Sequence, residues 1–405
     1  MKQSDVLVHD VSLVPLGARS GGVTGELHLT SEDGNRLGAI RWQLVASDLV
    51  VSSPRLSSEP IGPMHLGTSG AASWDMRDGS KRTVSLGLTQ LTFGPRDEIK
   101  VETEATYQFD GDLLTAAART VDLEYQQAVA AMPAALAPAE LSGEVSGPLS
   151  VKADVKGPLR KPADLALNVK IDLAALRASA RAAPHELNKQ FVYKTTLFDG
   201  RPRELIVGPA YPAFVPLGEV PKALIRAVLL SEDSMFMTHQ GFDFFEMKND
   251  LFAENENGEA VVRGASTMTQ QLAKNLYLSR ERTYARKVKE AFLTLALEAA
   301  VPKERLLEIY LNIIEWGPGL NGLGEASQHY FGKRPGELTV RESAYLATII
   351  PGPIRYYGFF TKGELPDVWE KRLADLLNKM HSAGDLSDEQ LSDALEPGMH
   401  FAKRP

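Results

Sequence analysis

The hydrophobic pattern of this 405-residue chain changes once along its length. Up to about residue 180, stretches such as GELHLTSEDGNRLGAIRWQLV and SLGLTQLTF alternate apolar and polar residues between Asp-Gly and Gly-Pro turns, which is typical of β-hairpins. From about residue 216, apolar residues recur every three and four positions, as in RKVKEAFLTLALEAAV and KERLLEIYLNII, which predicts helices. Because the chain is longer than one ordinary core, we predict a multidomain protein: a β-rich domain over residues 1–183 and a mostly α domain over 184–405.

Charge and composition exclude several functions. The formal net charge is -8, so the chain has no overall basic field and nucleic acid is not expected as a partner. The absence of cysteine excludes a disulfide framework and a thiolate metal site. The start, MKQSDVLVHDVSLVPL, lacks the features of a secretory signal, and the apolar run AFLTLALEAAV is shorter than the roughly 20 residues that span a bilayer. We therefore expect neither an export signal nor a transmembrane helix in the chain as written.

Two adjacent carboxylates, Glu232 and Asp233, end an apolar helical run in the stretch SEDSMFMTHQGFD. Carboxylates at a helix C-terminus oppose the helix dipole, which makes this position unusual. The flanking Met and Phe side chains predict partial desolvation of Glu232, which raises a carboxyl pKa and suits the group to accept a proton near neutral pH. A solvated helix end is the structural alternative, and His239 is expected as a hydrogen-bonding scaffold residue.

The stretch RGASTMTQQLAKNLYL combines a helix cap with a lysine. Gly264 permits a tight turn, Ser266 or Thr267 can cap the next helix, and Gln270 is placed as the capping-box partner of Thr267. A capped helix with no further role is the structural alternative. However, a helix N-terminus offers unpaired N–H groups to an anion, and Lys274 lies about two turns along the same helix. Together these features predict a phosphate site.

A basic run, SRERTYARKVKE, leads into Glu290. An i,i+4 pair of Arg286 and Glu290 on a solvated helix face is the structural alternative. Because Glu290 opens an otherwise apolar helix, it can instead lie at the edge of a cleft with Arg286 and Lys287. A carboxylate in that place can hold a divalent cation or orient the basic residues against a diphosphate leaving group.

Five motifs stand in the order, and at about the spacing, of those of family 51 glycosyltransferases: EDSMFMTHQGFD, RGASTMTQQLAKNLYL, RKVKE, KERLLEIYLN and GLGEASQHYFGK. Over roughly residues 195–380 the chain resembles a monofunctional biosynthetic peptidoglycan transglycosylase. The resemblance implies a lysozyme-like α-helical domain at the membrane surface that polymerises lipid II into β-1,4-linked glycan, with inversion and release of undecaprenyl diphosphate. It also implies the cell envelope, at the periplasmic face of the inner membrane, and partners among cell-wall synthesis proteins.

The resemblance also implies roles for individual residues. Glu232 matches the general base that takes the proton from the 4-hydroxyl of the acceptor sugar. Glu290 matches the second essential Glu, at which a divalent cation such as Mg or Mn assists the leaving group. The other matched positions are Asp233, Phe236 and His239 beside the base; Gly264, Ser266, Thr267, Gln270, Gln271, Lys274, Asn275, Arg286 and Lys287 around the donor and its diphosphate; and Glu308, Tyr310 and Asn312 as a structural brace.

Aromatic residues crowd the stretch FDFFEMKNDLFAENENGEAVV, between the first two motifs. The apolar side chains in question are Phe242, Phe244, Phe245, Leu251 and Phe252. The resemblance implies that this region dips into the bilayer to admit the lipid, which predicts an exposed apolar patch. Ordinary core aromatics are the alternative.

The chain departs from the family in the region before residue 180. A β-rich region stands where the family usually carries a transmembrane anchor. It weakly resembles the β-repeats of AsmA-like envelope proteins, on the two Gly-Pro-Leu pieces SGPLSVKADV and KGPLRKPADL. A coincidence of turn chemistry is the alternative. The second motif reads RGAST where many members have Gly-Gly-Ser-Thr, a form that fits the monofunctional branch.

Two other functions stay open beside the glycosyltransferase. A lysozyme-like glycan hydrolase predicts an acidic cleft without the basic row of Lys274, Arg286 and Lys287. An inactive lipid- or glycan-binding envelope module is the non-enzymatic alternative, which the β-rich region keeps open. The chain has no S-x-x-K motif, so no penicillin-binding transpeptidase is expected.

Overall fold

The computed structural model describes residues 2–13, 18–79, 81–138, 145–179, 183–252, 264, 266–279 and 281–402. The chain divides into two compact units. The first unit comprises Met1–Ala183, Asp243–Ser266 and Ser279–Ala299, and the second comprises Pro184–Phe242, Thr267–Leu278 and Ala300–Pro405. The segments Asp243–Ser266 and Ser279–Ala299, which lie in the region of the five motifs, therefore belong to the same unit as the β-rich part of the chain. The division into residues 1–183 and 184–405 remains a prediction about domains.

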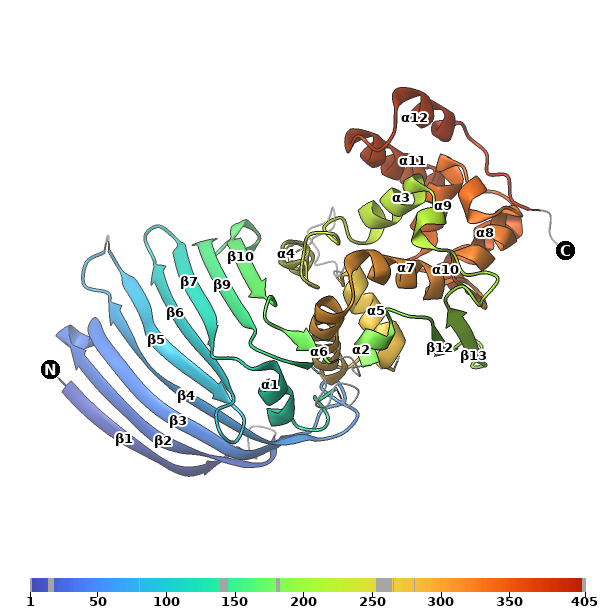
Figure 1. The fold of residues 1–405 in the computed structure, drawn as a ribbon. Helices are drawn as coiled ribbons and strands as arrows, with labels where there is room; N and C mark the ends of the chain where they lie inside the picture. The colour runs from blue at the N-terminus through green and yellow to red at the C-terminus, as the bar shows by residue number, and fades with distance from the viewer. Residues whose placement is uncertain are drawn as a thin grey trace. The chain divides into compact units, whose positions relative to one another are not determined.

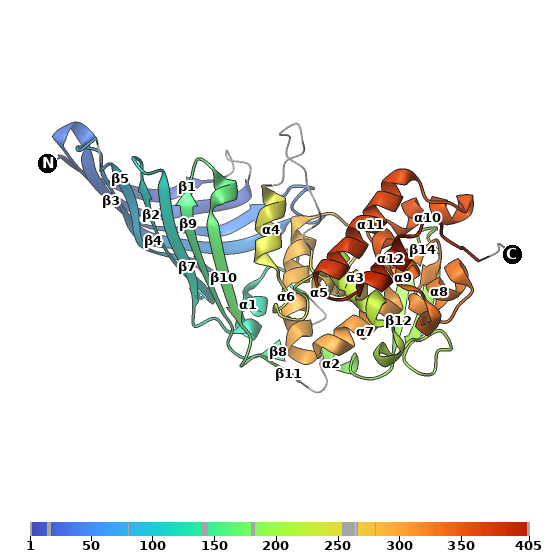
Figure 2. The same ribbon diagram turned by 90° about the horizontal axis from the view of Figure 1, so that it is seen from above.

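A curved, antiparallel, nine-stranded sheet dominates the first unit (Figures 1 and 2). Its strands, in spatial order, are β1 (Lys2–Ser12), β2 (Ala18–Glu32), β3 (Leu37–Val51), β4 (Ile61–Asp75), β5 (Thr83–Phe93), β6 (Ile99–Gln108), β7 (Leu113–Val121), β9 (Ser150–Pro158) and β10 (Ala166–Asp172). Neighbours in the sheet follow one another in the chain except at β7 and β9, between which α1 (Tyr125–Ala131) and β8 (Val145–Ser146) are inserted. The short β8 pairs with β11 (Arg177–Ala178). The predicted hairpin-built β region is confirmed.

The two Gly-Pro-Leu pieces are not equivalent in this sheet. The first, Gly147–Leu149, precedes β9, whereas the second, Gly157–Leu159, begins inside the end of β9 and leads to the 3-10 turn Pro162–Asp164. The resemblance to AsmA-like β-repeats and the alternative, a coincidence of turn chemistry, both remain predictions. In both pieces the glycine has a positive φ, a conformation that glycine adopts more readily than other residues.

The helices of the first unit are tied to the β-rich part by specific bonds. In α6 (Tyr284–Ala300), the backbone N–H groups of Tyr284 and Ala285 donate to the carbonyls of Arg55 and Leu56, at 3.1 and 2.8 Å. Farther along α6, the Phe292 carbonyl accepts from the hydroxyl of the buried Tyr125, at 2.9 Å. Beside β10 lies α4 (Phe244–Leu251), whose Lys248 Nζ donates to the carbonyls of Ala163 and Leu165, at 3.0 and 2.8 Å.

The second unit is mostly helical, with a β-hairpin of β12 (Phe191–Thr196) and β13 (Pro202–Val207) at its start. Its helices are α3 (Lys222–Glu232), α5 (Met268–Tyr277), α7 (Lys303–Ile313), α8 (Leu323–Phe331), α9 (Val340–Ile349), α10 (Pro353–Lys362), α11 (Asp367–Ser382) and α12 (Asp388–Leu395), and it also holds the small pair β14 (Glu315–Gly317) and β15 (Leu320–Asn321). The helix α2 (Ala183–Glu186) falls at the division between the units. The helical pattern of the sequence is confirmed.

The core of the second unit is built around α9. Every residue of this helix after Val340 is buried, and α3 and α11 pack against it. After its first turn, the run VRESAYLATII consists of apolar and small residues, as expected of a helix that is surrounded by others. None of the helices in the described part of the chain combines the length and hydropathy that a membrane crossing requires.

Candidate active site

The two carboxylates of the first motif lie at the end of one helix, and one of them also binds the start of another. Glu232 is the last residue of α3, and Asp233 follows as its C-cap. The Asp233 carboxylate reaches the start of α5, where its Oδ2 accepts the backbone N–H of Met268 at 2.9 Å. A negative charge at a helix N-terminus is favourable. The unusual position of Asp233 at the end of one helix is therefore explained by its place at the beginning of another.

His239 holds Asp233 in place. Its Nε2 lies 2.9 and 3.0 Å from the two Asp233 carboxylate oxygens, and the Gly241 backbone N–H donates to Nδ1 at 3.0 Å. Because a backbone N–H can only donate, Nδ1 accepts and Nε2 carries the hydrogen that Asp233 receives. The geometry is that of the hydrogen-bonding scaffold residue expected from the sequence.

Phe236 and the neighbouring methionines behave differently from one another. Phe236 is buried, lies edge-on to the His239 ring at a centroid distance of 6.1 Å, and has the Lys303 ammonium 4.5 Å from its own centroid. Met235 and Met237, in contrast, are 50% and 45% exposed. Cover of Glu232 by these methionines remains a prediction. The chain leaves α3 in a tight turn, with the Thr238 N–H bonded to the Met235 carbonyl.

Glu232 is half-buried and is held by a chain of two hydrogen bonds. Its Oε2 accepts from Gln271 Nε2 at 3.1 Å, and Gln271 Oε1 accepts from the Tyr310 hydroxyl at 3.1 Å. Burial raises the pKa of Tyr310 well above its ordinary value, so the phenol stays protonated and acts as the donor. Since Tyr310 occupies the amide oxygen, the amide nitrogen of Gln271 is directed to Glu232.

The surroundings of Glu232 raise the pKa of its carboxyl group. Desolvation is the largest cause, and the negative charge of Asp233 acts in the same direction. The Gln271 hydrogen bond and the charges of Arg372 and Lys274 lower the pKa without cancelling the effect of burial. The desolvated carboxyl predicted from the sequence is confirmed. Arg372, on α11, was not found by sequence reasoning because it belongs to no motif and reaches Glu232 only through the fold.

The start of α5 is a closed cap. Thr267 Oγ1 accepts the Gln270 N–H at 3.3 Å, Gln270 Oε1 accepts the Thr267 N–H at 3.1 Å, and both residues are buried. The predicted capping box is therefore present. The expectation of unpaired N–H groups at this helix end is corrected, because the Met268 N–H is bonded to Asp233 and the Gln270 N–H to Thr267. The structural alternative describes this end of the helix better than a phosphate site does.

A second cluster of motif residues lies in the first unit, on α6 and the residue Ser266. Arg286 Nη1 donates to Glu290 Oε2 at 2.6 Å, and Lys287 Nζ is bonded to Glu290 Oε1 and, at 2.9 Å, to Ser266 Oγ. The i,i+4 pair is present, but Glu290 is only 2% exposed, so the alternative of a solvated helix face is wrong. The cluster carries two cations against one carboxylate, and the Lys287 side chain is 39% exposed. It is therefore suited to meet an anion.

Glu290 does not offer a good metal site. Both of its oxygens already receive hydrogen bonds, one from Arg286 and one from Lys287. Within the described ranges, no group of three or more His, Asp or Glu side chains is placed to hold a metal ion. The expected Mg or Mn at Glu290 remains a prediction that these donors do not fit.

The fourth motif braces the segment that leads into α3. Asn312 Oδ1 accepts from the Val215 N–H, and Asn312 Nδ2 donates to the Val215 carbonyl, both at 2.9 Å. Glu308 Oε2 accepts from the Leu217 N–H at 2.8 Å, and Arg305 bonds its other oxygen. Tyr310, in the same motif, has the different task described above, in the hydrogen-bond chain to Glu232.

The remaining predicted residues are distributed as follows. Lys274 and Asn275 are half-buried on α5, and Gly264 is exposed. In the segment expected to meet the bilayer, Phe245 is 65% exposed, whereas Phe242, Phe244 and Phe252 are half-buried. None of these four rings is a core aromatic. Residues 253–263 and the side chain of Leu251 lie outside the described part of the chain.

The motif residues thus form two groups. In the second unit, Glu232, Asp233, Phe236, His239, Thr267, Gln270, Gln271 and Tyr310 are joined by the contacts described above. In the first unit, Ser266, Arg286, Lys287 and Glu290 are joined in the same way. A desolvated carboxylate and a separate basic cluster are the two parts that a group-transfer enzyme with an anionic leaving group requires.

Comparison with known proteins agrees with this class. The Transglycosylase family model matches residues 204–381. A biosynthetic peptidoglycan transglycosylase from Ralstonia nicotianae is 47% identical over 140 residues, which are 35% of this chain and 59% of the relative. Another, from a Janthinobacterium species, is 41% identical over 171 residues, which are 42% of this chain and 71% of the relative. The chain belongs to this transglycosylase family, which is a family of the cell envelope.

These likenesses cover only a part of the molecules compared. The chain spans 59% and 61% of the relatives from Ralstonia nicotianae and Bordetella avium. The crystal structure of penicillin-binding protein 1A from Haemophilus influenzae is 22% identical and covers 53% of this chain and 21% of that one, with a TM-score of 0.27. The family match begins at residue 204, so it does not include the nine-stranded sheet.

Proposed function

We propose that this protein is a peptidoglycan glycosyltransferase that polymerises lipid II into β-1,4-linked glycan, with inversion and release of undecaprenyl diphosphate. The observation that carries the proposal is Glu232, a half-buried carboxyl of raised pKa held by the hydrogen-bonded chain of Gln271 and the buried Tyr310. The family membership supports it.

On the acceptor side, Glu232 is the general base. Its carboxylate takes the proton from the 4-hydroxyl of the acceptor sugar while that oxygen attacks the anomeric carbon of the donor. A raised pKa makes the carboxylate a stronger base at neutral pH, and the Gln271 hydrogen bond fixes its orientation. Attack on the face opposite the leaving group turns the α-linked donor into a β-linked product.

On the donor side, the bond between the anomeric carbon and the diphosphate oxygen breaks, and the electron pair leaves with the diphosphate. Arg286 and Lys287 stabilise the negative charge that develops there, with Ser266 bonded to the same ammonium group. Glu290 holds both cations in place. A divalent cation, where one is required, would come with the diphosphate, because the Glu290 oxygens are already bonded to these cations.

We further infer that the second unit has a lysozyme-like fold and that the protein acts at the periplasmic face of the inner membrane. The exposed Phe245 on α4 supports contact with a membrane surface. Cell-wall synthesis proteins are the expected partners.

The test is an assay of the purified chain with lipid II in the presence of Mg. We expect polymeric glycan on a gel and an equivalent release of undecaprenyl diphosphate. The hydrolase alternative is tested in parallel with finished glycan strands as the substrate. Shortening of these strands without any polymer from lipid II would contradict the proposal.

A further inference from the structure

The nine-stranded sheet has one apolar face. On β3, the side chains of Trp42, Leu44 and Ala46 share a face, while Arg41 and Gln43 point the other way. The register carries this division across the sheet, since each residue directly opposite another lies on the same face. Along one row, Leu44 is opposite Thr68, Thr68 is opposite Leu91, and Leu91 is opposite Val101.

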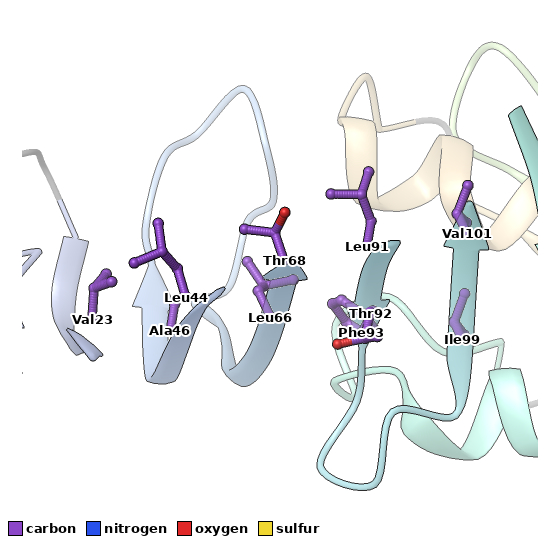
Figure 3. Close-up of a pocket in the computed structure, with 11 residues that line it drawn as sticks. Val23, Leu44, Ala46, Leu66, Thr68, Leu91, Thr92, Phe93, Ile99 and Val101 are labelled. Atoms are coloured by element: carbon purple, nitrogen blue, oxygen red, sulfur yellow. The ribbon is translucent and has the colours of Figure 1, made fainter. Parts of the chain in front are cut away.

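This face is hollowed into a cavity of about 450 Å³ over β2 to β6 (Figure 3). Its lining side chains include Val23, Leu44, Leu66, Leu91, Phe93 and Val101. None of these side chains is buried, and Leu91 is 44% exposed. The hydroxyl of Thr68, one of the few polar groups in the cavity, accepts a hydrogen bond from Trp42 Nε1 at 3.1 Å. The cavity therefore offers hydrocarbon contact and very little polar recognition, in the size range of ligand sites.

The length of the face favours an extended hydrocarbon chain as the occupant. The apolar face continues beyond the cavity, through Ala105 and Ala116 to Val155 and Leu167 on β10. Nine strands spaced about 4.8 Å apart give a face about 38 Å wide. A hollow of this kind would be poorly filled by the flat face of a second sheet, whereas a flexible chain can follow it.

The basic cluster of Arg286 and Lys287 belongs to the same unit and is connected to this face through a loop between two of its strands. The strands β3 and β4 line the cavity, and the loop between them carries Arg55 and Leu56. Their carbonyls accept the backbone N–H groups of Tyr284 and Ala285, the two residues before Arg286 and Lys287. The loop that leaves the cavity thus holds the start of the helix that bears the basic cluster. A molecule with a long hydrocarbon chain and an anionic diphosphate matches both features.

We propose that the apolar face of the sheet binds the polyprenyl chain of the lipid-linked donor, whose diphosphate is held by Arg286 and Lys287. This inference rests on the proposed glycosyltransferase function for the identity of the lipid. The β-rich part of the chain is then a part of the substrate site and not only an attachment to the enzyme.

The test is photolabelling of the full chain in phospholipid vesicles that contain undecaprenyl diphosphate with a diazirine in its prenyl chain. We expect mass spectrometry to find the label on β3 to β6. Leu91→Gln places an amide in the cavity and should lower this labelling by about tenfold, equivalent to about 1.4 kcal/mol. The matched control is Val45→Gln, at a 40% exposed position on the opposite face, which should leave labelling unchanged.

Two results would overturn the inference: equal labelling of both variants, or equal labelling of these strands by a phosphatidylglycerol with a diazirine in its acyl chain. Labelling requires no turnover. A chain that polymerises lipid II but is not labelled on the sheet would disprove the inference alone, while a labelled chain that makes no polymer would disprove the proposed function alone.

Discussion

The pKa of Glu232 is set by groups that can be changed one at a time. Gln271→Ala removes the hydrogen bond that lowers this pKa, so the pKa should rise. Because the base must be ionised to act, the acidic limb of the pH profile of kcat/KM should move to higher pH. Asp233→Asn removes a negative charge that raises the same pKa, so it should move the limb to lower pH.

The measurement is the rate of lipid II polymerisation as a function of pH for both variants and the wild type. Tyr310→Phe is a further variant, which keeps the ring but releases the amide of Gln271, and it should behave as a weaker form of Gln271→Ala. If both Gln271→Ala and Asp233→Asn displace the limb in the same direction, Glu232 is not the group that titrates.

Burial of Glu232 also has a consequence for stability. A carboxyl whose pKa is raised in the folded state stabilises the fold below its unfolded pKa, near 4.5, and this contribution is lost as the pH rises through the folded value. Glu232→Gln removes the buried charge, so its melting temperature at neutral pH should exceed that of the wild type. Thermal denaturation should show this difference decreasing toward pH 4.5. A difference that is constant with pH would point to a packing effect.

At the scale of the element, the closed cap of α5 should contribute to the rate of polymerisation as well as to the stability of the helix. Thr267→Ala should cost about 1 kcal/mol of stability, the usual value for a lost N-cap, and should lower polymerisation. The reason is that Thr267 Oγ1 also donates to the Gly241 carbonyl at 2.6 Å, while the Gly241 N–H holds His239.

The matched control for this prediction is Ser387→Ala, which removes the equivalent capping box at the exposed start of α12. It should cost similar stability in chemical denaturation and leave the rate of polymerisation unchanged. Thr267→Ser keeps the hydroxyl and should restore activity. An equal loss of activity in Thr267→Ala and Ser387→Ala would assign the effect to stability alone.

The elements that were predicted from sequence are those whose signals are local. The period of apolar residues predicts α3, α5, α6 and α7, and the spacing of Thr267 and Gln270 predicts the cap. The bond from Asp233 to the Met268 N–H could not be predicted, because it joins residues 35 positions apart and depends on the fold bringing the end of α3 to the start of α5. The same limit explains why the sequence predicts unpaired N–H groups at the start of α5.

At the scale of the whole molecule, the main difference concerns α6. Its motif predicted that it belongs with the other helices, but its bonds to Arg55, Leu56 and Tyr125 place it in the first unit. These partners lie more than 150 residues away in the chain and carry no motif, so no local pattern in the sequence indicates them. The proposed base and the proposed anion cluster therefore belong to different units.

The assignment of α6 to the first unit predicts how the chain unfolds. Leu293 on α6 is fully buried, so Leu293→Ala should cost about 2–5 kcal/mol. Calorimetry should show separate transitions for the two units. Leu293→Ala should lower the temperature of the same transition as Tyr125→Phe, a variant that loses one hydrogen bond at a cost of about 1 kcal/mol. Leu346→Ala, in the buried α9, should lower the other. If Leu293→Ala instead shifts the transition of Leu346→Ala, α6 is not part of the first unit in solution.

The most direct test of the proposed function is the rate of glycan polymerisation by Glu232→Gln, measured beside its binding of lipid II. The amide keeps the shape of the side chain but cannot take a proton. We expect binding close to that of the wild type and a rate lower by about 10²- to 10⁴-fold, the usual contribution of a general base. Polymerisation at the wild-type rate would show that Glu232 is not the base and would contradict this account.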